Sequence, residues 1–123
     1  MFRILFVGEQ VNLNKSKIPF DERYNSGKFL CDALVYGFSG YISRGIFKFY
    51  FNNSIVNGKI NKKLINKSRG KKVIALGNVA DKVLTDLRIK HKKLPHPAFF
   101  KRFRSKEGYK GYGFLLFKEI YGN

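Results

Sequence analysis

The sequence predicts an α/β fold, a three-layer α/β/α domain with a central, mainly parallel four-stranded sheet. Two short apolar runs, Arg3–Val7 and Lys72–Leu76, each end at a glycine, which is typical of a buried strand that opens into a loop. Segments with apolar residues at helical spacing separate the strand candidates. This alternation of strands and helices predicts parallel strands with helices on both faces of the sheet.

The first strand, Arg3–Val7, leads into a long polar loop from Glu9 to Asn25. Ligands of open α/β sheets bind beyond the carboxyl ends of the strands, so we expect this loop to be functional. A helix is expected from Asn25 or Ser26, either of which can cap it, to about Tyr36. Its inward stripe would consist of Phe29, Leu30, Ala33 and Leu34.

The second strand is expected over Gly45–Phe51, an aromatic-rich segment that ends at Asn52-Asn53-Ser54. Lys59–Lys67 is a weak helix candidate, with Ile60, Leu64 and Ile65 on one face, and it leads to the third strand, Lys72–Leu76. A helix capped by Asn78 follows. Its inward stripe would consist of Val79, Ala80, Val83, Leu84 and Leu87.

The last part of the chain predicts a short fourth strand over Lys92–Leu94, followed by a helix after Pro97. Gly108 to Gly113 is a glycine-punctuated stretch, and a final helix is expected near Phe114–Tyr121. Right-handed crossovers between parallel strands then bring the strand-end loops to one rim of the sheet. These loops lie at Gly8, Asn53, Gly77 and His96.

The length of 123 residues is enough for a single domain, 1–123, with its own core. The chain has 25 Lys and Arg against 8 Asp and Glu, a formal net charge of +17, which indicates a polyanionic partner. Basic residues alternate with aromatic ones in Phe99–Arg104 and Lys106–Tyr112, a pattern that favours nucleic acid, with phosphate contacts beside stacking surfaces. A solvated basic surface without a specific partner is the alternative explanation.

Other features narrow the class of protein. No apolar run reaches the roughly 20 residues of a spanning helix, and the first residues do not resemble a signal peptide, so we expect an intracellular protein without membrane partners. Cys31 is the only cysteine, which leaves no internal disulfide and no cysteine-ligated cluster. We expect no metal, no cofactor and a monomeric protein.

Five segments, in this order along the chain, resemble the uracil-DNA glycosylase superfamily, most closely its thermophile-type branch. They cover nearly the whole chain. Gly8-Glu9-Gln10 corresponds to the first motif of that branch, and Val73-Ile-Ala-Leu-Gly-Asn-Val-Ala80 is similar to its strand and Leu-Gly-x-x-Ala helix start. The other segments are Ile18–Leu30, which resembles a Pro-Phe element, Phe49–Val56, which resembles a strand ending in Thr-Asn, and Leu94-Pro-His-Pro-Ala98, which resembles a His-Pro-Ser motif.

The resemblance implies an enzyme that flips uracil, or a related damaged base, out of DNA and hydrolyses its N-glycosidic bond without a metal. Glu9, with Gln10 beside it, would orient the attacking water or stabilise the cationic sugar, and His96 would donate a hydrogen bond to the departing base. Asn53 would read the base edge with its amide, Phe20 would stack on the ring, and Gly8 would also belong to the base-binding site. Each residue also has a structural alternative: a surface ion pair for Glu9, an Asx turn for Asn53, a core position for Phe20 and a solvent-facing loop for His96.

The resemblance also implies a surface that contacts DNA, in which an apolar side chain after Pro97 wedges into the duplex while basic residues hold phosphates. A helix with buried aromatic and solvated basic residues is the alternative. The residues assigned to this surface are Ser26, Lys28, Gly77, Asn78, Pro97, Ala98, Phe99, Phe100, Lys101, Arg102 and Arg104.

The chain departs from the branch at three places. Gln10-Val11-Asn12 replaces Ala-Pro-Gly, Ala98 replaces the serine after His-Pro, and the cysteines of the iron–sulfur cluster are absent. A catalytically weak or inactive DNA-binding module that recruits replication or repair proteins is therefore an alternative function. An enzyme acting on RNA or on a free nucleotide is a second one.

Overall fold

The computed structural model describes residues 2–10, 30, 32–38, 45, 47–96 and 108–121. Leu30 and residues 32–38 are helical. The other elements, in chain order, are β1 (Phe2–Gln10), β2 (Phe47–Val56), β3 (Lys59–Ile60), α2 (Leu64–Lys67), β4 (Lys72–Leu76), α3 (Asn78–Asp86), β5 (Lys92–Leu94) and α5 (Gly108–Tyr121).

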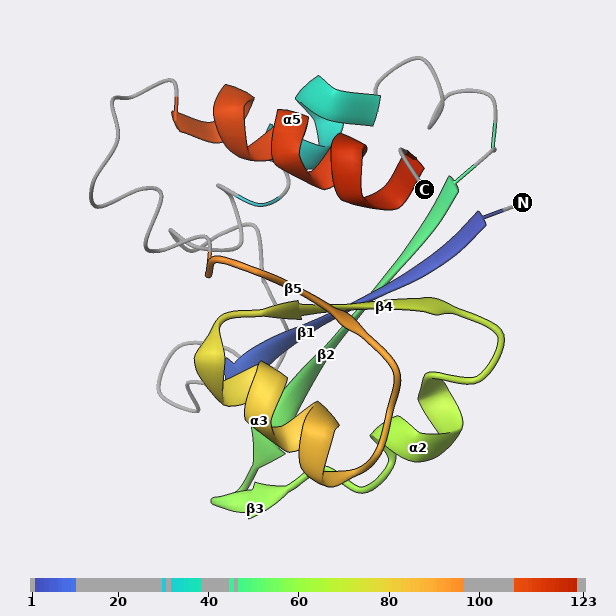
Figure 1. Cartoon of the computed structure of the whole chain (residues 1–123), viewed down its shortest axis with the longest axis vertical. Coiled ribbons are helices and arrows are strands. Elements are labelled where there is room, and N and C mark those ends of the chain that lie inside the picture. Colours follow the sequence, from blue (N-terminus) through green and yellow to red (C-terminus); the bar gives the residue numbers. More distant parts are fainter. Residues whose placement is uncertain are drawn as a thin grey trace.

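The fold is mixed α/β, with a five-stranded sheet in the order β3-β2-β1-β4-β5 (Figure 1). Strands β2, β1, β4 and β5 are parallel, as expected, whereas β3 pairs with the end of β2 in an antiparallel manner. The expected count of four strands is therefore wrong by this one strand. The sheet is also curled and not flat.

The fifth strand comes from a hairpin that the sequence prediction missed. Asn57 and Gly58 both have positive φ angles, 53° and 73°, as a two-residue type I′ turn requires. This turn folds Lys59–Ile60 back onto β2, so the helix expected over Lys59–Lys67 begins only at Leu64. Of its expected inward stripe only Leu64 is buried.

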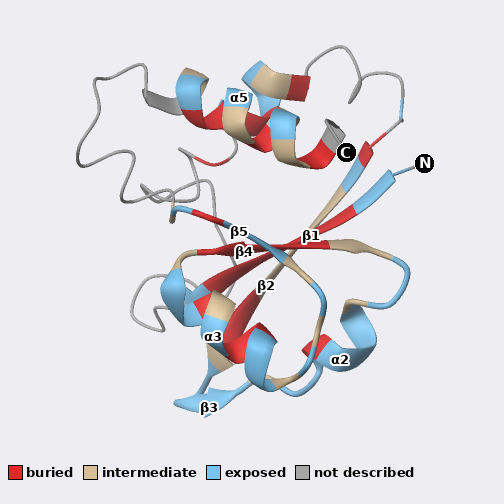
Figure 2. Ribbon diagram, in the orientation of Figure 1, coloured by how far each residue is buried: buried red, intermediate tan, exposed pale blue. Residues whose placement is uncertain are grey.

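The central strands are buried on both faces, and Figure 2 shows this as red ribbon through the middle of the sheet. On one face Ile4, Phe6, Ile74 and Leu76 pack with α5 and with the helical residues 30 and 32–38. On the other face Leu5, Val7, Val73 and Ala75 pack with α3 and α2. The apolar runs of β1 and β4 therefore have the two-sided burial that the sequence predicts.

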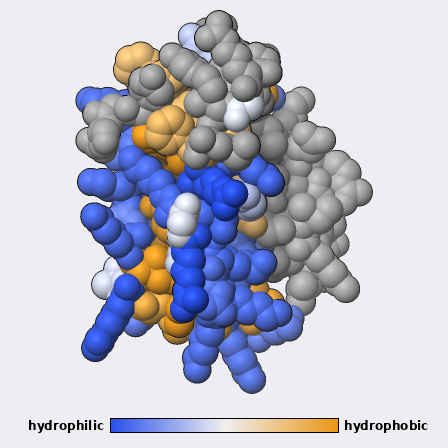
Figure 3. All heavy atoms as spheres, turned by 90° about the vertical axis from the view of Figure 1, so that its right-hand side faces the viewer, coloured by the Kyte–Doolittle hydropathy of each residue, from blue (hydrophilic) through white to orange (hydrophobic). Residues whose placement is uncertain are grey.

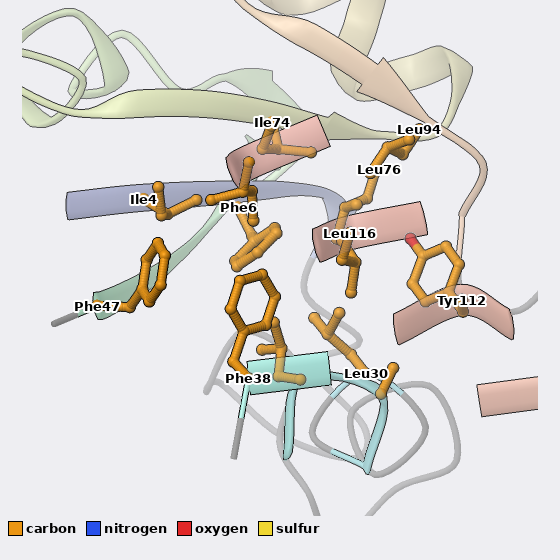
Figure 4. Close-up of a cluster of buried hydrophobic side chains, with 13 residues drawn as sticks. Ile4, Phe6, Leu30, Phe38, Phe47, Ile74, Leu76, Leu94, Tyr112 and Leu116 are labelled. Atoms are coloured by element: carbon orange, nitrogen blue, oxygen red, sulfur yellow. The ribbon is translucent and has the colours of Figure 1, made fainter. Parts of the chain in front are cut away.

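Phenylalanine rings fill much of the first face (Figure 4). Phe38 meets Phe47 and Phe49 edge-on, with ring centroids 5.0 Å and 5.4 Å apart. The ring of Phe6 stacks with that of Phe51 at 5.6 Å. These geometries are the favourable ones for aromatic pairs, so the aromatic residues of β2 fix the helices of this layer to the sheet.

Helix α5 begins at Gly108, earlier than the expected Phe114, and it contains the glycines that were interpreted as turn residues. The reason is a close helix crossing. A Cβ atom on Gly113 would collide with the carbonyl oxygen of Ala33, and one on Gly37 would lie 2.7 Å from the carbonyl oxygen of Gly113. These two glycines therefore allow backbone contact between α5 and the helical residues 32–38.

The predicted inward stripes are confirmed in part. Leu30, Ala33 and Leu34 are buried, as are Ala80, Val83 and Leu84 of α3, whereas Val79 is exposed. The loop expected from Glu9 does not begin there, because β1 continues through Gln10. The rest of the segment expected as this loop, the start of the first helix and the helix expected after Pro97 lie outside the described residues. Within the described part of the chain, none of the helices combines the length and the apolar character needed to cross a membrane.

Candidate functional site at the carboxyl edge of the sheet

The four parallel strands end at the same edge of the sheet, and this edge carries the predicted strand-end residues that the structure describes. Gly8, near the end of β1, pairs directly with Asn53 of β2. Gly77 follows β4, which is the neighbour of β1 on its other side, and His96 follows β5, the neighbour of β4. Residues separated by more than 40 positions in the sequence thus meet at one edge.

Asn53 lies inside β2, because this strand continues to Val56 and does not end at residues 52–54 as expected. It is buried, with 5% of its surface exposed. Its backbone N–H donates to Oδ1 of Asn52 (2.9 Å), and its carbonyl accepts from Nδ2 of Asn61 (2.9 Å). Among the described residues, none forms a hydrogen bond with the Asn53 carboxamide, a group that carries both a donor and an acceptor.

Asn52 and Asn61 are supporting residues that the sequence interpretation missed. Nδ2 of Asn61 donates to Oδ1 of Asn52 (3.1 Å), and the backbone N–H of Asn61 donates to the carbonyl of Ser54 (2.9 Å). The hairpin at Asn57-Gly58 carries Asn61 into this position. The Asn-Gly dipeptide was the available signal, since it is a strong hairpin turn sequence.

Glu9 is the second group at this edge, and its side chain is exposed. Its backbone carbonyl accepts a hydrogen bond of 2.7 Å from Oγ of Ser54, a side chain that is fully buried. This bond fixes the backbone of Glu9 to β2 next to Asn53. Ser54 was not recognised from the sequence, where a serine after two asparagines is an ordinary turn pattern.

Gly77 brings the backbone of the β4–α3 turn against His96. Its φ of 102° and ψ of 176° belong to a region that is essentially restricted to glycine. A Cβ atom here would lie 3.2 Å from Cβ of His96, and the Gly77 N–H donates to the carbonyl of Leu94 at 2.9 Å. Gly77 is also the N-cap of α3; Asn78, expected to be the cap, is the exposed first residue of that helix.

His96 is half-buried, and burial lowers the pKa of its imidazole below the usual 6.5. The negative charge of Glu9 acts in the opposite direction and raises it, but burial is the larger effect. Two conclusions follow. His96 and Glu9 are close enough to interact electrostatically, and the imidazole is neutral at pH 7.

Tyr112 of α5 holds the turn that carries His96. Its hydroxyl donates a hydrogen bond of 2.6 Å to the carbonyl of Pro95, the residue before His96. Tyr112 is fully buried, and burial raises the pKa of its hydroxyl, which therefore remains a donor. The sequence interpretation missed this residue because nothing in the glycine-rich stretch distinguishes it from an ordinary core tyrosine.

The other histidine, His91, has a structural role. Its Nδ1 lies 2.7 Å from the carbonyl oxygen of Ile89, and its Nε2 lies 2.7 Å from Oδ1 of Asp81 on α3. These contacts tie the segment before β5 to α3. Among the described residues, no group of three or more His, Cys, Asp or Glu is placed to hold a metal ion.

The structure therefore places Gly8, Glu9, Asn53, Gly77 and His96 along one edge of the sheet, where the charge of Glu9 acts on His96. Asn78 follows Gly77 at the start of α3. For Gln10 it gives only the backbone, which pairs with Ile55. The predicted site residues that lie outside the described residues are Phe20, Ser26, Lys28, Pro97, Ala98, Phe99, Phe100, Lys101, Arg102 and Arg104. No protein-family model matches the chain, and no curated protein matches its sequence.

Proposed function

We propose that the chain is a uracil-DNA glycosylase-type hydrolase, which releases uracil or a related damaged base after flipping it out of DNA. The observation that supports this most is that an acid, a carboxamide and a neutral imidazole lie along one edge of the sheet, from Glu9, Asn53 and His96. Helices on both faces of a mainly parallel sheet are compatible with the three-layer arrangement of that superfamily, which is part of the proposal.

The reaction is the addition of water across the bond between the sugar and the base. The C1′–N bond breaks, its electron pair leaves with the base, and the oxygen of water bonds to C1′. Positive charge develops on the sugar and negative charge on the base, so the groups that stabilise these two charges lower the barrier. The Glu9 carboxylate is suited to the sugar and to accepting the proton of the water.

A neutral His96 is suited to the base. It donates one hydrogen bond to a base oxygen as negative charge develops there, and it does not neutralise the nearby Glu9 carboxylate. The burial that lowers its pKa thus supports the role of a hydrogen-bond donor without net charge.

Asn53 is suited to reading the base. One carboxamide presents a donor and an acceptor side by side, which matches the edge of uracil and mismatches that of cytosine. The hydrogen bonds of Asn52 and Asn61 hold the Asn53 backbone, so the amide needs little ordering when a base arrives.

The test is incubation with oligonucleotides that contain one uracil, single-stranded and double-stranded, followed by alkaline cleavage of abasic sites. We expect strand cleavage by the wild type, and a loss of at least about 100-fold in His96→Ala, Asn53→Ala and Glu9→Gln, since each removes a transition-state contact. Matched controls are Asn66→Ala and Asp86→Asn, which remove an exposed carboxamide and an exposed carboxylate elsewhere. The absence of base release by folded wild-type protein would exclude the enzyme.

A DNA-binding module is the second candidate, and one observation favours it. The first motif departs from the glycosylase pattern from Gln10 onward. β1 continues through Gln10, which pairs with Ile55, so this departure begins in a paired strand and not in the expected functional loop. Salt-dependent binding of DNA without base release would identify such a module.

A further inference from the structure

A second feature lies at the other end of the sheet, where the strands begin. A cavity of about 410 Å³ opens there between the amino ends of β4 and β5. Its described lining contains four lysines, one histidine and one valine, and no Asp or Glu: Lys71, Lys72, Val73, Lys90, His91 and Lys92. β4 has five residues, so its two ends, and with them this cavity and the His96 edge, are roughly 16 Å apart along the strand.

Two of the lysines are already ordered by the fold. Nζ of Lys71 donates to the carbonyl of Lys67 (2.7 Å), and Nζ of Lys72 donates to the carbonyl of Glu119 (2.6 Å). An ammonium group has three donors, so each retains donors for a ligand. Because these charges are held in place before binding, a bound anion would cost little side-chain ordering.

The neighbouring strands extend the positive charge around the cavity. Arg3 of β1 pairs directly with Lys48 of β2, and Nζ of Lys48 and of Lys71 lie 5.3 Å and 4.8 Å from the ring centroid of Tyr50. Like charges directly opposite each other destabilise a sheet, and a polyanion bound beside them would relieve this repulsion. The sequence from Phe47 to Ala80 contains no Asp or Glu to do so.

Figure 3 shows the side of the molecule that faces right in Figure 1, where the chain enters β4, and hydrophilic side chains crowd much of its described surface. Among the contacts of the described lining residues, the Asp81 carboxylate lies 2.7 Å from Nε2 of His91. The four lysines of the lining give the cavity an excess of positive charge, which attracts anions.

We propose that this cavity is a second nucleic-acid site, which binds the phosphates of a strand at the edge of the sheet opposite His96. A concave site with point charges on two strand ends admits successive phosphates of a flexible strand, with Lys90 and Lys92 as the exposed contacts. This inference rests on charge and shape at the amino edge, and it holds whether or not the protein releases bases.

The test is binding of a fluorescent oligo(dT) without uracil, measured by anisotropy over a range of salt concentrations. We expect Lys90→Glu/Lys92→Glu to weaken binding at least about 10-fold and to reduce the slope of log K against log salt by about 1.4, the value for two phosphate contacts on a single strand. The control is Lys59→Glu/Lys82→Glu, which changes the net charge equally at exposed positions outside the cavity and should preserve the slope. Equal losses in both variants, or unchanged binding in the first, would overturn the proposal.

Three further measurements locate the contacts and separate other sources of phosphate. Lysine acetylation followed by mass spectrometry should show that the oligonucleotide protects Lys90 and Lys92 but not Lys59. Inorganic phosphate should compete only weakly, and vesicles containing anionic lipid should bind no better than neutral ones. Tight binding of inorganic phosphate, or loss of vesicle binding in the variant with oligonucleotide binding retained, would assign the cavity to a different ligand and refute a nucleic-acid site.

Discussion

At the scale of single residues, Tyr112 couples the last helix to the turn that carries His96. In Tyr112→Phe the hydrogen bond to the Pro95 carbonyl is lost while the ring remains in the core. We expect the free energy of unfolding to fall by about 1 kcal/mol, because Pro95 is exposed and water can replace the donor. Urea denaturation measures this.

Tyr112→Phe also tests whether Tyr112 positions His96 for base release. A shift of the Pro95-His96 turn should lower kcat of base release more than it raises KM, whereas a purely structural role would leave both unchanged under conditions where the protein is folded. Tyr36→Phe is the control, since Tyr36 is an exposed tyrosine on a different helix. Equal kinetics of Tyr112→Phe and wild type would limit Tyr112 to stability.

His96 gives a pH prediction. Burial lowers its pKa below 6.5, so between the lowered pKa and 6.5 the unfolded chain binds more protons than the folded chain. The free energy of unfolding therefore rises with pH in this interval. The stability that comes from the neutral His96 is lost as the pH falls through the same interval. We expect the wild type to lose more stability than His96→Gln between about pH 7 and about pH 5.5 in urea denaturation. Parallel pH dependences of the two proteins would contradict this burial effect.

At the scale of elements, the crossing of α5 over the helical residues 32–38 depends on glycine. In Gly113→Ala the new Cβ collides with the Ala33 carbonyl, which is backbone and cannot move aside easily. We expect a loss of about 1–3 kcal/mol in the free energy of unfolding, the range for overpacked contacts.

Gly111 offers a matched control on the same helix, because a Cβ atom there meets nothing within 4 Å. Gly111→Ala should stabilise the protein by about 0.5–1 kcal/mol through helix propensity. Thermal unfolding of both variants checks the pair. If Gly113→Ala were as stable as Gly111→Ala, the two helices would not be in close contact.

The elements also show what the sequence could predict. The buried strands β1 and β4 followed from their continuous apolar runs, because two-sided burial leaves a pattern in the residues themselves. The glycines of α5 misled the prediction because a tertiary contact, which propensity does not contain, selects glycine at Gly113. β3 was not predicted, because Ile60 and Leu64 have helical spacing, whereas the Asn57-Gly58 turn pairs Lys59–Ile60 with β2.

At the scale of the whole molecule, the edge at which the candidate site lies followed from topology alone. Parallel strands with right-handed connections place Gly8, Asn53, Gly77 and His96 at one edge of the sheet, and this placement does not depend on their side-chain contacts. The groups that hold the site were not predictable in this way. Ser54, Asn61 and Tyr112 act through hydrogen bonds to backbone carbonyls, and such bonds depend on three-dimensional distances that no sequence spacing fixes.

The net charge of +17 affects the stability of the whole molecule, because repulsion among its positive charges destabilises the folded state at low salt. Lys48→Glu replaces a like-charge pair opposite Arg3 with an attractive one, which should stabilise the protein by about 0.5 kcal/mol more than the change in net charge alone. Lys59→Glu makes the same change in net charge opposite Val56, so its stability measures the effect of net charge alone. Thermal unfolding at low salt should rank Lys48→Glu above Lys59→Glu and both above the wild type, and the differences should shrink at about 0.3 M salt, where the Debye length is short. Equal stabilities of the two variants at low salt would show that Arg3 and Lys48 do not repel each other measurably, and the charge at the amino edge would then be too well screened to attract a strand.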